Sequence, residues 1–370
     1  MLLFFALKQT TEKENLLVSS FWERAIIFSR SEWLGIDADH LLSSTCEKPG
    51  FHPQIKKEAR TEMVIDVHYH LIPALPEEMV ENLIEDVARA ARVMRKKVDR
   101  GELLERARER WPDPSGEKLL LEMEKSGIDF TCISAVDRME SKALTPEVAQ
   151  FQNKIAAQIA EKNPRKLMAF AGVDPRRPQA ADMLKQCFEE FGMRGLKYHP
   201  DHGYNPVGEE SYKLLAIVER HKGILLTHTG PLGPPSRCKF TEPGLLADLA
   251  VDFPGLKVIA AHSGQVNWRE WAALASHQPN LFGDLAMWDA LAFGHFELFC
   301  RELRDLIDFA GVEKVLFGTG GPIYGIISPV KKWVQLLKDL PGISPPGVKF
   351  AEEEVSAILG GNAKSILGLA

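Results

Sequence analysis

The sequence predicts a (β/α)8 barrel of the TIM-barrel class over residues 63–370, with a helical insertion after the first strand and an N-terminal extension before it. Two observations lead to this prediction. Eight short apolar runs alternate with amphipathic helical patterns after residue 62. The runs are also apolar enough to be buried on both faces, which is typical of parallel strands in α/β proteins. An open, doubly wound sheet is the alternative that this pattern leaves open.

The first expected strand is the run MVIDVHYHL at residues 63–71. The remaining strands are expected at 130–137, 167–175, 195–201, 224–230, 257–264, 281–288 and 314–320. Helical patterns between them cover 117–127, 146–164, 178–192, 209–223 and 295–311. Several of these patterns end in Gly, and two carry Pro in the first turn, as helix termini prefer.

The first 62 residues differ in character from the rest of the chain. Scattered Ser, Thr, Lys and Glu surround isolated apolar patches, with no sustained period. We therefore expect the functional domain to begin at Met63, with residues 1–62 as an extension that is disordered or results from an over-called start site. A small ordered subdomain is the alternative. Residues 75–113, rich in Arg and Glu, are expected to cap one end of the barrel.

Composition excludes several classes of protein. The net charge of −6 and a pI near 6.0, with no basic stripe, argue against a nucleic-acid binder. Five cysteines without a CxxC pair indicate neither a disulfide framework nor a thiolate zinc site, so a cytoplasmic location is expected. The opening MLLFFALK is a poor signal peptide, and no stretch approaches the ~18 apolar residues of a membrane span.

Histidines mark the ends of four expected strands. In a barrel of this class the active site lies at the carboxyl ends of the strands. His68 and His70 end the first strand on one face, because side chains alternate along a strand, and two such imidazoles can bind one metal ion. His199, His228 and His262 end the fourth, fifth and sixth strands. This grouping of five of the eleven histidines favours a metal site over histidines that are spread at random.

Six motifs in this order resemble the amidohydrolase-related family (amidohydrolase 2), a family of metal-dependent barrel hydrolases with an aminocarboxymuconate-semialdehyde decarboxylase-like branch. The motifs are IDVHYH (65–70), GLKYHP (195–200), LLTHTG (225–230), AAHSG (260–264), VLFGTGGP (315–322) and GGNAKSILGL (360–369). The resemblance covers about residues 63–370.

The resemblance implies one divalent metal ion held by His68, His70 and His228, and zinc is the first choice for this ion. It implies that His262 contacts the substrate or moves a proton. The family's last ligand is an aspartate at the end of strand eight, and Gly320 stands at the matching position. Such a carboxylate both ligates the ion and takes a proton, so its absence should lower activity by at least ~10²–10⁴-fold.

Five further residues are candidates for the substrate pocket. Asp284, near the end of strand seven, is expected to orient substrate or support the site. Lys197 has two interpretations: a carbamylated metal bridge, as in two-metal relatives, or a charge that serves the substrate. His199 is placed in the pocket rather than on the metal. Arg237 could hold a substrate carboxylate or be a solvated loop residue, and Trp288 could line the pocket or serve packing.

The resemblance implies a metal-dependent hydrolase that acts on a small cyclic or carboxylated substrate through a metal-activated water. One alternative is a non-oxidative decarboxylase (carboxy-lyase) of the same family, because both chemistries use the His-x-His pair and the strand-five histidine. A further alternative is a catalytically impaired barrel, because of Gly320. The expected partners are a small-molecule substrate and a second copy of the chain in a homodimer, without nucleic acid or membrane.

Overall fold

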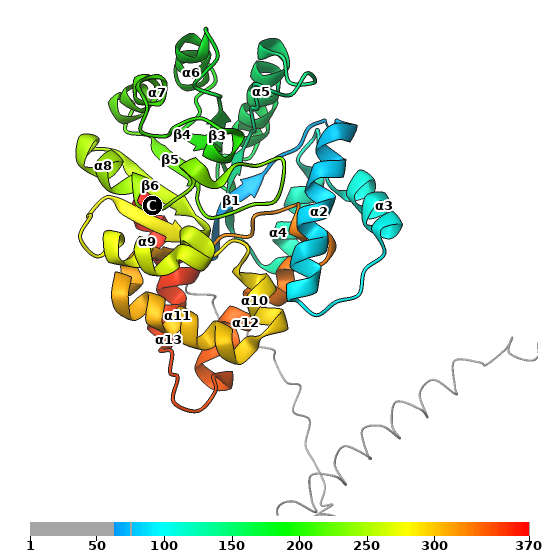
Figure 1. The fold of residues 1–370 in the computed structure, drawn as a ribbon, viewed down its shortest axis with the longest axis vertical. Helices are drawn as coiled ribbons and strands as arrows, with labels where there is room; N and C mark the ends of the chain where they lie inside the picture. Colours follow the sequence, from blue (N-terminus) through cyan, green and yellow to red (C-terminus); the bar gives the residue numbers. More distant parts are fainter. Residues whose placement is uncertain (1–62, 75, 370) are drawn as a thin grey trace, which may run out of the picture. The chain divides into compact units, whose positions relative to one another are not determined.

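The computed structural model describes residues 63–74 and 76–369. The prediction of an N-terminal extension at 1–62 lies outside these residues. Within them, eight parallel strands follow one another in sequence order around a single sheet (Figure 1). The strands are β1 (Ile65–His70), β2 (Phe130–Ser134), β3 (Leu167–Gly172), β4 (Gly195–Tyr198), β5 (Ile224–His228), β6 (Lys257–Ala261), β7 (Leu281–Asp284) and β8 (Val315–Leu316). All eight expected strands are confirmed, with shorter ends.

Backbone hydrogen bonds between the first and last strands close the sheet. The Val67 N–H donates to the Phe317 carbonyl at 3.0 Å, and the Gly320 N–H donates to the His68 carbonyl at 2.9 Å. The fold is therefore a (β/α)8 barrel, as the sequence predicted, and the open doubly wound sheet is ruled out. Closure matters for function because it brings the ends of β1 and β8 together.

Helices surround the strands in Figure 1. They are α2 (Glu77–Val93), α3 (Arg100–Arg110), α4 (Glu117–Ser126), α5 (Pro146–Lys162), α6 (Ala180–Glu189), α7 (Glu209–Arg220), α8 (Leu245–Asp252), α9 (Trp268–Ala275), α10 (Trp288–Gly294), α11 (Phe296–Ala310), α12 (Val330–Ile343), α13 (Glu352–Ser356) and α14 (Asn362–Leu367). The predicted patterns correspond to α4, α5, α6, α7 and α11. Local chemistry sets their ends: Thr145 Oγ1 accepts from the Val148 N–H before α5, and Gly127 ends α4 with φ 69°.

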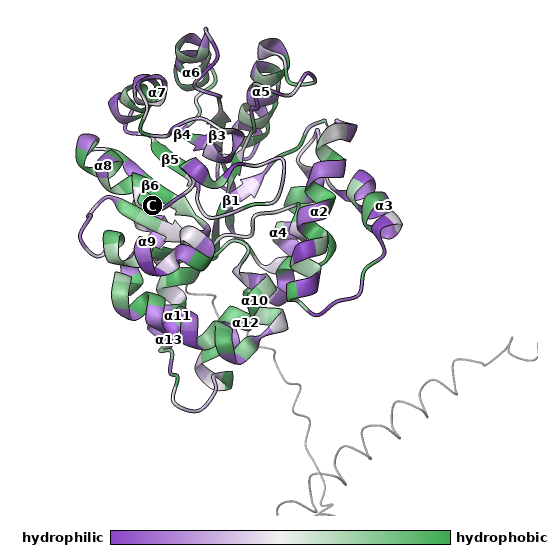
Figure 2. Ribbon diagram, viewed as in Figure 1, coloured by the Kyte–Doolittle hydropathy of each residue, from purple (hydrophilic) through white to green (hydrophobic). Residues whose placement is uncertain are grey.

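Alternate residues of the strands build an apolar cluster with α14, and because they share one face of the sheet, this cluster fills the barrel. Its members include Phe130, Phe170, Leu226, Ile259 and Leu316. The other face packs under the surrounding helices. In Figure 2, β5 and β6 are largely hydrophobic and the outer sides of the helices carry hydrophilic residues, whereas β1 with its histidines is more hydrophilic. The apolar cluster inside the barrel gives way to the histidines at the carboxyl ends of the strands.

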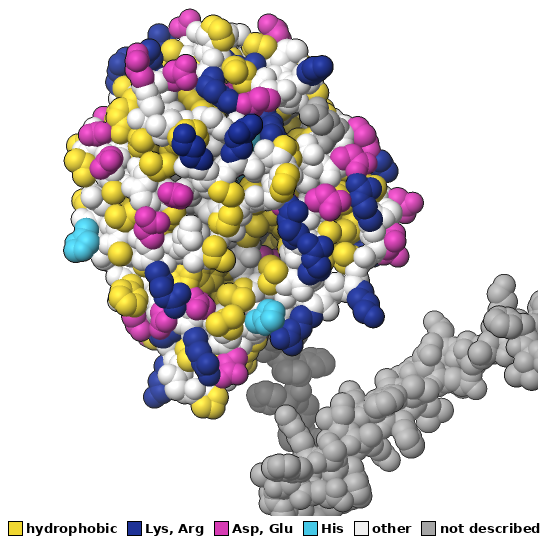
Figure 3. All heavy atoms as spheres, viewed as in Figure 1, with side chains coloured by type: hydrophobic (Ala, Val, Ile, Leu, Met, Phe, Trp, Pro, Cys, Tyr) yellow, Lys and Arg dark blue, Asp and Glu magenta, His cyan; other side chains and the backbone are white. Residues whose placement is uncertain are grey.

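The expected insertion after β1 is confirmed as α2 and α3. Its apolar side, including Val80, Ile84 and Val87, packs with Ile323 and Ile327 from the segment after β8. The face in Figure 3 shows acidic and basic side chains interspersed rather than gathered by sign. Across residues 63–74 and 76–369, no helix combines the length and apolar character needed to cross a membrane.

Candidate metal centre

The end of β1 presents two imidazole nitrogens to each other. Nε2 of His68 and Nε2 of His70 lie 3.1 Å apart. The Nδ1–H of His68 donates to Oδ2 of Asp284 at 2.9 Å, since a carboxylate only accepts. The Ser134 hydroxyl donates to a backbone carbonyl, so its oxygen accepts from Nδ1 of His70 at 3.4 Å. Both Nε2 atoms are therefore left as electron-pair donors.

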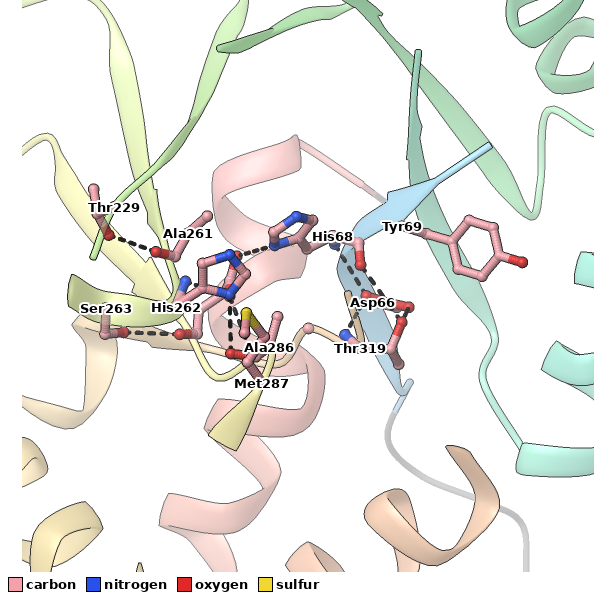
Figure 4. Close-up of polar contacts among 12 residues, drawn as sticks. Asp66, His68, Tyr69, Thr229, Ala261, His262, Ser263, Ala286, Met287 and Thr319 are labelled. Atoms are coloured by element: carbon pink, nitrogen blue, oxygen red, sulfur yellow. Dashed lines mark hydrogen bonds and ion pairs between the residues drawn. The ribbon is translucent and has the colours of Figure 1, made fainter. Parts of the chain in front are cut away.

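His262 is held at the end of β6 from three sides. Its Nδ1–H donates to the Ala286 carbonyl at 3.0 Å, and its backbone N–H donates to Oδ1 of Asp284 at 2.9 Å. The indole N–H of Trp288 donates to the His262 carbonyl at 3.0 Å. These contacts hold a backbone with φ 66°, which side chains of L residues rarely adopt. The His262 ring lies beside that of His68, with centroids 5.0 Å apart (Figure 4).

His228 and His199 complete the group of five. Nε2–H of His228 donates to the Gly230 carbonyl at 3.1 Å, which leaves Nδ1 as its acceptor. Nδ1–H of His199 donates to Oδ1 of Asp201 at 3.2 Å. The His228 ring centroid lies 5.0 Å from that of His262 and 6.0 Å from that of His199. Each histidine thus has one nitrogen tied to an acceptor and the other available as a donor of electrons.

Burial keeps all five imidazoles neutral. Loss of hydration holds the pKa of His68, His70 and His262 well below the ordinary value. The same cause lowers the pKa of His199 to about 3 and that of His228 to about 4. Neutral imidazole is the form that binds metal ions.

Lys197 lies at the centre of this group. Its Nζ is 3.1 Å from Nε2 of His68, and its side chain is almost fully buried. Burial lowers the pKa of Lys197 to about 7, against the opposing effect of Asp284. Without an ion, the lysine can donate to the electron pair of His68 Nε2, the atom that would otherwise bind a metal.

The nitrogen set fits a divalent cation. Nitrogens bound to one ion at ~2.1 Å lie roughly 3 Å apart, close to the separation of the two Nε2 atoms of His68 and His70. Ligating atoms of His68, His262 and Asp284 also lie within 4.8 Å of one another. Both oxygens of Asp284 already accept N–H groups, including that of Ala286, so this carboxylate orients imidazoles.

Asp66 has a structural role in the same region. Its carboxylate accepts from the His68 N–H at 3.0 Å and from the hydroxyl and N–H of Thr319 at 2.6 and 3.0 Å (Figure 4). Burial raises the pKa of Asp66 to about 7. The register of β1 against β2 shifts between Asp66 and Tyr69, which turns the Tyr69 ring away from the histidines. Asp66 therefore fixes the turn after β8 to β1.

A cavity of about 140 Å³ lies over the histidines. Four of them form part of its wall: His70, His199, His228 and His262. Much of the remaining wall is apolar, from α2 and the loops after β5, β7 and β8: Met79, Leu83, Leu232, Met287, Ile323 and Tyr324. The cavity suits a small ligand held between an apolar wall and a polar floor.

Gly320 lies on the cavity wall, as the motif of strand eight predicted. Its φ is +62°, and a Cβ added there would meet the Ala286 Cβ at 3.5 Å, an ordinary contact. The position therefore has room for a side chain, at the cost of a left-handed backbone. Lys197, Asp284 and His68 are buried behind the wall rather than exposed in it.

Two sequence-predicted pocket residues take other positions. Arg237 is exposed and does not contribute to the cavity wall, because the loop after β5 directs its side chain toward Gly203. Trp288 lines a different hollow and supports the His262 carbonyl instead. Trp288 is thus a packing and positioning residue.

Sequence reasoning missed most residues of the cavity wall, among them Asp201, His202 and Arg138. Asp201 and His202 follow His199 in the short 3-10 turn Pro200–His202, and the second histidine in that motif was the available signal. Arg138 follows β2 just as the histidines follow their strands. The rule that strand ends carry function applied to it equally.

A (β/α)8 barrel with convergent, neutral histidines at the carboxyl ends of its strands defines the class of metal-dependent barrel enzymes. The family model described as Amidohydrolase matches residues 65–369. The chain belongs to the amidohydrolase family, and the resemblance seen in its motifs is confirmed. A search of the curated proteins found no significant match.

Solved structures share the fold at low sequence identity. The 5-carboxyvanillate decarboxylase of Sphingomonas paucimobilis is 16% identical, with 84% of this chain and 100% of that chain covered and a TM-score of 0.56. A dihydroxybenzoic acid decarboxylase of Polaromonas, with bound manganese and 2-nitroresorcinol, is 18% identical, with 83% and 97% covered and a TM-score of 0.57. The 4-oxalomesaconate hydratase of Rhodopseudomonas palustris is 18% identical, with 82% and 95% covered and a TM-score of 0.54.

Proposed function

We propose that this protein is a metal-dependent decarboxylase that removes carbon dioxide from a small carboxylated aromatic substrate. The observation that supports this most is the small cavity whose floor is the buried histidine cluster. The decarboxylases among the solved structures favour the same chemistry. Hydrolysis, the first expectation from the sequence, ranks second because several of the similar solved structures are decarboxylases and one is a hydratase.

The proposed ligands are His68 and His70 through Nε2 and His228 through Nδ1. A bound divalent ion would act as a Lewis acid that polarises an oxygen of the substrate. Zinc is our first choice for a site made of imidazoles. Manganese is the alternative, because the Polaromonas enzyme carries it.

The chain's own residues would position the substrate and move the proton. Departure of carbon dioxide leaves an electron pair on a ring carbon, which must take up a proton. His262 is the proposed carrier: its free ring nitrogen would accept a proton from a hydroxyl of the substrate or from solvent and pass it to that carbon, while its backbone and Nδ1 stay fixed. Lys197 would stabilise negative charge from behind the floor, and the apolar wall would exclude water and strengthen both effects.

Gly320 sets the level of activity in this proposal. Gly320 lies on the cavity wall but has no side chain, so it offers neither a metal ligand nor a proton-transfer group. We therefore propose slow turnover and weakened metal binding, by the ~10²–10⁴-fold typical of a lost acid or base. If turnover is too slow to measure, this proposal becomes the same as the alternative of a catalytically impaired barrel.

The test combines metal analysis with release of carbon dioxide. Wild-type protein loaded with zinc or manganese is expected to hold one ion per chain and to release carbon dioxide from a panel of hydroxybenzoates. His70→Ala should lose the ion, whereas His277→Ala, on an exposed histidine, should keep it. Equal metal content in the two variants would contradict the assigned site. Turnover of lactones or amides without release of carbon dioxide would restore the hydrolase interpretation.

A further inference from the structure

Arg138 is a cation on the cavity wall without a described anionic partner. It follows β2, lines the cavity and is only partly exposed. Among residues 63–74 and 76–369, its guanidinium makes no ion pair and no hydrogen bond. A partly buried guanidinium that faces a cavity without a counter-ion indicates a site for an anion.

The acidic neighbours of Arg138 are committed to other arginines. Asp137 accepts two hydrogen bonds from Arg177, both at 2.6 Å. Asp174 accepts from Arg176 at 2.6 Å, and the same guanidinium also binds Glu140. Two arginines of the loop after β3 thus pair with Asp137, Asp174 and Glu140, and none of these acids pairs with Arg138.

The same ion pairs fix the turn that carries Arg138. The Ser141 N–H donates to the Arg138 carbonyl at 3.0 Å, and the Met139 N–H donates to Asp174 at 3.1 Å. Ser141 also lines the cavity. Because Glu140 is held between these residues, the turn is anchored on both sides. The backbone at Arg138 is therefore held beside the wall, so a bound ligand needs to order only the arginine side chain itself.

Two buried ring nitrogens on the same cavity also lack a described partner. They are Nε2 of His199 and Nδ1 of His202. The rings of these residues are stacked, with centroids 4.9 Å apart. Burial lowers the pKa of His202 against the opposing effect of Asp201, and the charge of Arg138 adds to the lowering. Buried polar atoms without a partner commonly mark the place of a ligand.

We propose that Arg138, with His202 and Ser141, forms a subsite for a second carboxylate of the substrate, separate from the histidine floor. The substrate class is then a single aromatic ring that carries two carboxylates. One carboxylate leaves as carbon dioxide, and Arg138 holds the other. This inference rests on the proposed function, since it names the substrate class of the same site.

The experiment measures binding rather than turnover. Isothermal titration of the metal-loaded full chain compares isophthalate with 3-nitrobenzoate, which has nearly the same shape but only one carboxylate. A charge-assisted contact at Arg138 should make isophthalate bind roughly 10- to 100-fold more tightly. Arg138→Gln should remove this preference while metal content stays at the wild-type level. Arg138→Lys should restore part of it, because the charge returns without the bidentate geometry.

Arg237→Gln is the matched control, an exposed arginine outside the cavity wall. It should leave the preference for isophthalate unchanged. The inference is overturned if Arg138→Gln weakens both ligands equally, if Arg237→Gln removes the preference, or if wild-type protein binds the two ligands alike. A protein that shows the preference but, even as the Gly320→Asp variant, releases no carbon dioxide from any hydroxybenzoate or ring dicarboxylate refutes the proposed chemistry and leaves the subsite standing.

Discussion

Restoring a carboxylate at position 320 is the sharpest test of what limits this barrel. In Gly320→Asp, the new Cβ would meet only the Ala286 Cβ, at 3.5 Å, so no clash opposes it. The cost comes from φ +62°, a left-handed backbone that disfavours an L residue by roughly 1 kcal/mol. For a domain of this size, that loss should lower Tm by about 2–4 °C.

The gain should far exceed this cost. A carboxylate on the cavity wall can bind the ion and transfer a proton, so metal occupancy should rise and turnover should increase by ~10²–10⁴-fold. Gly320→Asn has the same shape and a similar tolerance of the left-handed backbone, but no charge. It should reproduce the loss in Tm without the gain.

The assay is metal content after dialysis, together with initial rates of carbon dioxide release and Tm by calorimetry. Equal metal content and equal rates in the Asp and Asn variants would refute the reasoning. That result would mean either that the side chain at 320 does not reach the ion or that the barrel is a binding protein.

Three further predictions concern the supports of the site. Asp284→Asn should weaken metal binding by about 10–100-fold in chelator competition, because the carboxylate orients His68, and unchanged affinity would contradict that role. Burial raises the pKa of Asp289 to about 6, so the free energy of unfolding should fall by up to roughly 3 kcal/mol between pH 4 and 6. In urea denaturation, the free energy of unfolding of Asp289→Asn should change less with pH than that of the wild-type protein. Parallel pH profiles for the two proteins would show that Asp289 is not the group responsible. Arg177→Gln should cost about 3–5 kcal/mol in the same assay, because it leaves Asp137 buried without its counter-charge, and a loss below 1 kcal/mol would show that the pair is solvated.

The fold could be predicted from local pattern because a parallel barrel strand is apolar on both faces. Each of the eight apolar runs, from 63–71 to 314–320, therefore predicted a strand correctly. The predicted strands only extended too far at their ends. The ends of strands are harder to predict, because backbone hydrogen bonds between neighbouring strands determine where each strand ends. At β1, the register shift between Asp66 and Tyr69 interrupts the regular alternation of side chains between the two faces of the strand.

The residues at strand ends followed from the same rule, and His68, His70, His228 and His262 do converge. Their roles depend on contacts that the sequence cannot show. For three of the imidazoles the acceptor that fixes the ring lies far away in the chain, as Asp284 does for His68, whereas His199 and His228 use acceptors two residues away. Which nitrogen remains available is therefore a tertiary property.

The sequence by itself determined the barrel, the histidine cluster and the glycine at position 320, because periodicity and residue identity are local. The tertiary structure decided which arginine faces the cavity. Arg237 and Arg138 are equivalent as sequence signals, since each follows a strand. Ion pairs between the loops after β2 and β3 neutralise the acids around Arg138 and fix its turn at the wall, whereas the loop after β5 leaves Arg237 exposed. Such pairing depends on residues about 40 positions apart and becomes visible only once the chain is folded.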